Sequence, residues 1–125
     1  MLIDDSKFDN IVNKRLLEMN DLAEEISVCL NGVEAMDYWN KLSKEAISSR
    51  SFPEVIFLDI NMPLMNGFEF LEAFGQLPAS VSEEVKIIML TSSINPEDEA
   101  RSVKSKLVSR YLHKPLTVEK LAKLF

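Results

Sequence analysis

The sequence has 125 residues, of which 46% are apolar and 27% charged, the balance of one globular domain with a single core. Its 14 basic and 20 acidic side chains give a net charge of −6 and a pI near 4.8, which argues against direct nucleic-acid binding. The chain has no apolar run of membrane-spanning length, no signal-peptide pattern and one cysteine, Cys29, so we expect a cytoplasmic protein without an internal disulfide and without membrane contact.

The chain opens with a short apolar run, residues 2–3, which predicts the end of a buried strand. A strand this short would result if its first residues had been trimmed from the sequence. Asp4-Asp5 follow it directly, and Ser6 is a suitable N-cap for the next element. A helix is predicted from about residue 7 to residue 19, because apolar residues recur there at helical spacing. These residues are Phe8, Ile11, Val12, Leu16 and Met19.

The rest of the chain continues this alternation of strand-like and helical stretches. In order, we expect a strand at residues 26–30, a helix over about 33–47, a loop at 48–53, a strand from residue 55, a helix at 67–74, an irregular polar segment at 75–84, a strand at 85–90, a helix that starts at Asn95-Pro96 and runs to about 106, a strand at 108–112 and a last helix capped by Thr117. Five strands alternating with five helices predict a parallel sheet with helices on both faces. We expect one domain over residues 1–125, with no output domain.

The third of these strands ends in the most informative stretch of the chain. Residues 55–58 read Val-Ile-Phe-Leu, an apolar run typical of a strand that is covered on both faces. The run ends at Asp59, and Pro63 and Gly67 then break the regular structure. Ligands of open α/β sheets bind outside the carboxyl ends of the strands, so Asp59 is a candidate site residue.

Other polar residues directly follow the remaining strands and reach the same edge if all strands are parallel. They are Asp4, Asp5, Thr91 and Lys114. Carboxylates packed together repel and raise one another's pKa unless a cation is present. Oxygen ligands without cysteine or histidine suit a hard ion, Mg²⁺ or Mn²⁺, and a lysine with a hydroxyl can bind phosphoryl oxygens. The set therefore predicts a carboxylate that accepts a phosphoryl group.

On these residues the chain resembles a response-regulator receiver domain of two-component signalling (CheY-like). The motif at residues 59–63, Asp-Ile-Asn-Met-Pro, carries the resemblance together with Gly67, the acidic pair, Thr91 and Lys114-Pro115. Tyr111 stands at the spacing of the family's switch aromatic. The resemblance implies a flavodoxin-like (βα)5 fold with strand order 2-1-3-4-5.

The resemblance also implies roles for individual residues. Asp59 would be the phosphoacceptor, served by a sensor histidine kinase or a histidine phosphotransfer protein. Mg²⁺ (or Mn²⁺) would be held by Asp5, Asp59 and the main-chain carbonyl of Asn61, with Asp4 acting mostly through water. Thr91 and Lys114 would bind the phosphoryl oxygens, and the Lys114–Pro115 peptide bond would be cis.

Phosphorylation would then change the surface of the domain. Thr91 and Tyr111 would couple the phosphoryl group to the face formed by residues 95–106, residues 108–112 and the last helix, where an unknown downstream protein would bind. The domain would be a monomer or a phosphorylation-dependent dimer. It would be no enzyme beyond self-phosphorylation and slow autodephosphorylation.

Three alternatives stay open on the sequence. A phosphorelay intermediate would pass the group on to a histidine phosphotransfer protein. A Mg²⁺-dependent phosphohydrolase is disfavoured, because Asn61 stands where such an enzyme would need a second aspartate. A phosphorylation-independent adaptor is disfavoured too, because the acidic pair, Asp59 and Lys114 are all present.

Overall fold

The computed structural model describes residues 1–45 and 52–125. Its strands form one parallel sheet in the order β2-β1-β3-β4-β5, which confirms the order that the resemblance implies. The strands are β1 (Leu2–Ile3), β2 (Val28–Cys29), β3 (Val55–Leu58), β4 (Lys86–Thr91) and β5 (Val108–His113). The helices are α1 (Lys7–Met19), α2 (Gly32–Ser43), α3 (Gly67–Gly75), α4 (Ala79–Ser82), α5 (Pro96–Lys104) and α6 (Val118–Ala122).

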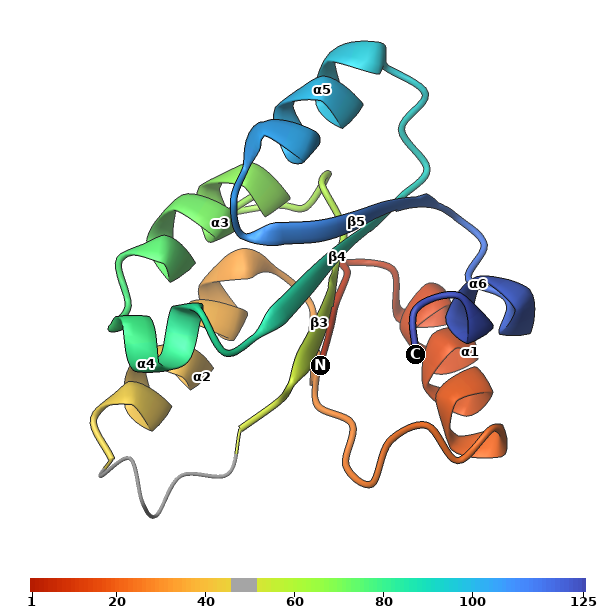
Figure 1. The fold of residues 1–125 in the computed structure, drawn as a ribbon, viewed down its shortest axis with the longest axis horizontal. Helices are drawn as coiled ribbons and strands as arrows, with labels where there is room; N and C mark the ends of the chain where they lie inside the picture. The colour runs from red at the N-terminus through yellow and green to blue at the C-terminus, as the bar shows by residue number, and fades with distance from the viewer. Residues whose placement is uncertain (46–51) are drawn as a thin grey trace.

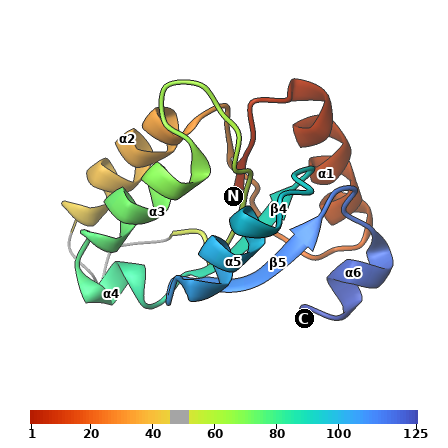
Figure 2. The ribbon, with the colours of Figure 1, turned by 90° about the horizontal axis from the view of Figure 1, so that it is seen from above.

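Helices cover both faces of the sheet (Figure 1). Seen from above, α1 and α6 lie on one side, and α2 and α3 lie on the other (Figure 2). Each side has its own apolar core. Leu17 of α1 and Leu121 of α6 pack with Phe57 and Ile88 of the sheet, whereas Trp39 of α2 packs edge-to-face on Phe74 of α3, with ring centroids 5.1 Å apart. Among the described residues, no helix has the length and apolar character to cross a membrane.

Side-chain caps fix where the helices begin. Ser6 accepts a hydrogen bond from Asp9 N, and Asn31 accepts one from Glu34 N. At α3, Asn66 and Glu69 form a reciprocal capping box. Ser6 and Asn31 follow the ends of β1 and β2 by three and two residues, so these caps keep the loops at the carboxyl edge of the sheet short.

Several expected elements differ in extent from those observed. The segment 75–84 is not irregular throughout, because α4 forms within it after Pro78. The second strand pairs only at Val28–Cys29, and the second helix ends at Ser43. Its expected end near residue 47 and the first part of the expected loop at 48–53 fall on residues 46–51, outside the described part of the chain.

The apolar face expected for the first helix is wrong in detail. Phe8 and Ile11 are 73% and 68% exposed, and the residues of α1 that are buried are Asn10, Asn13 and Leu17. The inward position of Asn10 has a polar cause, because its side-chain amide donates to the main-chain oxygen of Asp4 at 2.8 Å. Apolar spacing alone could not reveal that a buried carbonyl at the strand end needs a donor from this helix.

Candidate functional site

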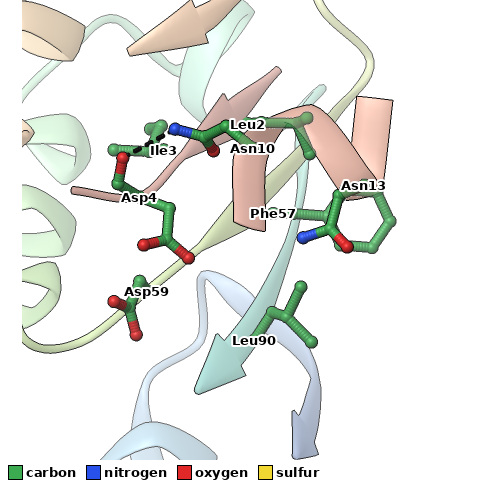
Figure 3. A pocket seen from close by; sticks show the side chains of 8 residues that line it. All are labelled: Leu2, Ile3, Asp4, Asn10, Asn13, Phe57, Asp59 and Leu90. Atoms are coloured by element: carbon green, nitrogen blue, oxygen red, sulfur yellow. Dashed lines mark hydrogen bonds between the residues drawn. The ribbon is translucent and has the colours of Figure 1, made fainter. Parts of the chain in front are cut away.

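The carboxylates of the predicted site come from two neighbouring strands. Ile3 of β1 is paired with Leu58 of β3, so the next residues, Asp4 and Asp59, leave the sheet side by side. Asp59 N donates to Ile3 O at 2.9 Å, which fixes this register. Figure 3 shows the two side chains close together at this edge. With Asp5 they form a group in which one carboxylate oxygen of each residue lies within 4.8 Å of the others.

Main-chain donors hold these carboxylates in place. Asp4 Oδ1 accepts from Ser6 N at 2.9 Å, and Asp59 Oδ1 accepts from Ile60 N, also at 2.9 Å. Each acid therefore keeps its Oδ2 atom for other partners. The side-chain amide of the buried Asn10 donates to the main-chain oxygen of Asp4 (Figure 3). Asn10 and Asn13 line a cavity of about 10 Å³ beside it. The acids are thus positioned by the first turn of α1 as well as by the sheet.

Gly67 allows the backbone of α3 to approach the end of β3. A Cβ atom at this position would lie 2.4 Å from Asp59 O and 2.9 Å from Ile60 Cα. The Gly67 amide donates to Ile60 O at 2.8 Å. Any side chain here would push the start of α3 away from the residue that carries the site's central carboxylate.

Lys114 supplies the positive charge of the site. Its Nζ lies 2.7 Å from Asp4 Oδ2, 2.8 Å from Asp9 Oδ2 and 3.7 Å from Asp59 Oδ2. Its amide donates to Thr91 O at 2.8 Å, and the following peptide bond to Pro115 is cis. Burial alone would lower the pKa of Lys114. The hydrogen bonds to Asp4 and Asp9 outweigh that effect, so the pKa lies above its ordinary value and the side chain is charged.

The surroundings of Asp59 disfavour its charged form. Asp59 is 6% exposed, and burial raises its pKa to about 6. The negative charge of Asp4 adds to the rise, whereas Lys114 and the Ile60 amide oppose it. A carboxylate in this condition gains from any cation placed beside it.

The other predicted residues lie around this centre at different depths. Thr91 is fully buried at the end of β4, and its Oγ1 accepts from Ser93 N at 3.1 Å. Tyr111 is half-buried on β5, and its hydroxyl has no hydrogen-bond partner among the described residues. Asn61 is exposed, two residues after Asp59. The structure therefore brings Asp4, Asp5, Asp59 and Lys114 together, with Thr91 at the neighbouring strand end.

Two residues of this centre, Asp9 and Asn10, were not predicted from the sequence. Both lie in the first part of α1, where Asp9 reads as an ordinary acid near a helix start and Asn10 as a polar surface residue. Asp9 contacts Lys114, which is 105 positions away in the sequence, so only the fold brings the two side chains together. The only signal in the sequence is the place of Asp9 and Asn10 just after Asp4-Asp5, and it gives no direction for the side chains.

The donor set fits a hard divalent cation. The three clustered acids offer oxygen atoms alone, which suit Mg²⁺ or Mn²⁺. The pKa of Asp59 is raised by burial and then by the charge of Asp4, so a bound cation would favour its charged form. Asp5 is exposed whereas Asp4 and Asp59 are buried, so the group is open to solvent on the Asp5 side, as an ion that keeps several waters requires.

Comparisons with known proteins identify the family of this chain. A family model described as response regulator receiver domain matches residues 1–125. The response regulator Rcp1 of Synechocystis is 28% identical over 124 residues, covering 99% of this chain and 81% of the relative. A two-component response regulator from Cytophaga hutchinsonii superposes with a TM-score of 0.86 at 33% identity, covering 98% of this chain and 90% of the other. The Mn²⁺-bound form of Rcp1 gives a TM-score of 0.74 at 27% identity, with 98% and 85% covered.

Proposed function

The chain belongs to the response regulator receiver domain family, and from this premise we propose that Asp59 accepts a phosphoryl group from a phosphohistidine. The donor would be a sensor histidine kinase or a histidine phosphotransfer protein. The observation that supports this most directly is the gathering of three carboxylates within 4.8 Å, with the Lys114 ammonium 3.7 Å from Asp59 Oδ2.

The transfer is a substitution at phosphorus. Asp59 Oδ2 attacks, a P–O bond forms, the P–N bond to the donor histidine breaks, and the histidine nitrogen leaves with the electron pair. Asp59 keeps its second oxygen on the Ile60 amide, 2.9 Å away, which orients the attacking atom. Lys114 and the Thr91 hydroxyl bind oxygens of the transferred group. The acyl phosphate needs no proton from the protein.

The residues that would hold Mg²⁺ or Mn²⁺ are Asp5, Asp59 and the Asn61 carbonyl, with Asp4 in support through water. When bound, the ion neutralises charge on the carboxylates and on the phosphoryl oxygens. A structure of Rcp1, a relative, is described as Mn²⁺-bound, which supports this assignment. The buried Asp4 also has a role without the ion, because its Oδ2 lies 2.7 Å from Lys114 Nζ.

Output would follow from a shift between two packings of the α5-β5-α6 face. The phosphoryl group adds about −1.5 to −2 charge beside Thr91. In the unphosphorylated protein the Thr91 hydroxyl oxygen accepts from Ser93 N, and Ser93 Oγ donates to Asp98 Oδ2 at 2.6 Å. A movement of Thr91 toward the phosphoryl group would be transmitted along this chain of bonds to α5. Tyr111, which lies on β5 within this face and is partly buried against the core, is the aromatic residue that would respond.

We further propose that residues 1–125 act as one receiver unit whose output is binding of a downstream protein. Phosphoryl transfer onward to a histidine phosphotransfer protein is the second candidate. It is supported by relatives such as the sensor histidine kinase RcsC of Salmonella typhi, in which the similar part, at 29% identity, makes up 11% of the protein.

The test is labelling with acetyl phosphate and Mg²⁺. We expect one acid-stable, base-labile phosphate per chain, detected by intact mass, that is absent in Asp59→Asn and absent when EDTA replaces Mg²⁺. BeF₃⁻ should shift backbone NMR signals from Thr91 to Leu112. Labelling that persists in Asp59→Asn would refute the assignment, and turnover of a small phosphate ester would favour a phosphohydrolase. Transfer of the label to a histidine phosphotransfer protein would support the relay.

A further inference from the structure

Lys114 has one partner that the proposed phosphoryl chemistry leaves unused. The distance from its Nζ to Asp9 Oδ2 is 2.8 Å, close to the 2.7 Å to Asp4 Oδ2 and shorter than the 3.7 Å to Asp59 Oδ2. In the unphosphorylated protein the ammonium therefore rests between Asp4 and Asp9, near Asp59 but not on it. Asp9 is neither at a strand end nor within the acidic cluster of Asp4, Asp5 and Asp59.

The backbone on both sides of this ion pair is fixed. Asp9 lies in the first turn of α1, and its amide donates to the N-cap Ser6 at 3.1 Å. Lys114 is tied to the end of β4 by the hydrogen bond from its amide to Thr91 O. The pair also lies partly out of solvent, with side-chain exposures of 17% for Lys114 and 34% for Asp9. A charge-assisted hydrogen bond between such fixed groups is among the stronger polar contacts in a protein.

We propose that Asp9 is a positioning residue that competes with the phosphoryl group for the Lys114 ammonium and so lowers the stability of the phosphorylated state. The inference rests on the proposed function, because it requires Lys114 to bind phosphoryl oxygens at Asp59. Lys114 has three donors, and two of them point to Asp4 and Asp9. One donor is left for a phosphoryl oxygen, and because Nζ lies 3.7 Å from Asp59 Oδ2 a second bond to the phosphoryl group would have to replace the bond to Asp9. The Asp9 carboxylate would then lie near a second anion without a bond to the ammonium.

The consequence is a definite direction for a variant that removes the charge. In Asp9→Asn the ammonium loses a competing anion, and the phosphoryl analogue loses a repelling neighbour. We expect the affinity for BeF₃⁻ at saturating Mg²⁺ to rise about tenfold, the size of one exchanged charge-assisted hydrogen bond. The acyl phosphate should also survive longer. A residue that only supports the fold would act in the opposite direction, since its loss would weaken the site.

The experiment measures the BeF₃⁻ affinity of the full chain by NMR titration, with the ¹⁵Nζ signal of Lys114 as a second readout. Asp9→Glu keeps the charge and should stay within about twofold of the wild type. Glu18→Gln is the matched control, because Glu18 is an exposed acid on the same helix. In Asp9→Asn the Lys114 signal of the free protein should move toward its position in the BeF₃⁻ complex.

The outcomes separate the two proposals. If the wild type binds BeF₃⁻ but Asp9→Asn binds it equally or more weakly, the role of Asp9 is refuted and the proposed function stands. An equal gain in Glu18→Gln would also refute it, because net charge would then explain the effect. If the wild type does not bind BeF₃⁻ with Mg²⁺ at all, both proposals fail.

Discussion

Replacing Asp59 by asparagine should make the metal-free protein more stable at neutral pH. Asp59 is 6% exposed, and burial with the adjacent charge of Asp4 raises its pKa to about 6 from a value of 3.8. Folding therefore disfavours the charged carboxylate. The neutral side-chain amide that the substitution introduces can still accept from the Ile60 amide, which donates to Asp59 Oδ1 in the wild type. The substitution thus removes the charge and keeps the local hydrogen bond.

The sign and the size of the effect follow from linkage. The pKa is higher in the folded state than in the unfolded state, so the carboxyl costs nothing below pH 3.8 and its full penalty applies above about pH 6. The rise of the pKa from 3.8 to about 6 corresponds to at most about 3 kcal/mol. The gain from Asp59→Asn should thus grow between pH 4 and pH 6 and then level off. The contributions of the other titrating groups to the free energy of unfolding are common to both proteins and cancel when the two are compared.

The measurement is urea unfolding of both proteins in EDTA at several pH values between 4 and 8, repeated with Mg²⁺. In EDTA we expect the variant to unfold at higher urea at pH 7, with a smaller advantage at pH 4.5. Mg²⁺ should stabilise the wild type more than the variant, because binding to the folded state adds stability only where the site is intact. A variant that is less stable than the wild type at pH 7 in EDTA, or an advantage independent of pH, would refute the reasoning.

Two further substitutions test the same centre. Lys114→Met leaves Asp4, Asp9 and Asp59 without their shared cation. We expect the free energy of unfolding to fall by about 3 kcal/mol in EDTA and by less in Mg²⁺. Equal losses in urea unfolding under the two conditions would contradict this. Gly67→Ala places a Cβ atom 2.4 Å from Asp59 O and should cost about 2 kcal/mol. Gly75→Ala, whose Cβ meets only Leu107 Cδ1 at 3.3 Å, is its control and should change the thermal midpoint much less.

The convergence of strand-end residues could be predicted from the sequence because it follows from the pattern of apolar runs, whereas the strand order is implied by the resemblance to receiver domains. A buried parallel strand is apolar throughout, and its last residue marks the edge of the sheet. The run at residues 55–58 shows this, since Asp59 directly follows it and lies beside Asp4. The position of Thr91 and Lys114 follows from the same pattern at the ends of β4 and β5.

What the sequence could not give is the direction of side chains on α1. Phe8 and Ile11 are at helical spacing with Val12, yet they face solvent. The face that turns inward carries Asn10 and Asp9, because a carbonyl and an ammonium at the strand ends need polar partners. Hydrophobic periodicity assumes that burial is apolar, and it fails where a helix packs against the charged edge of a sheet.

The charges of this site connect stability with function. Asp4, Asp9 and Asp59 share one ammonium, and two of these acids lie in the buried cluster with Asp5. Burial raises the pKa of Asp59, the charge of Asp4 adds to the rise, and the single lysine opposes it only in part. A divalent ion held by these acids would relieve the repulsion, and with the ion bound the site could accept the further negative charge of a phosphoryl group. The negative charge that destabilises the free domain would therefore also give the metal its affinity. A variant that removes this charge, such as Asp59→Asn, should gain stability in the free domain and lose phosphorylation.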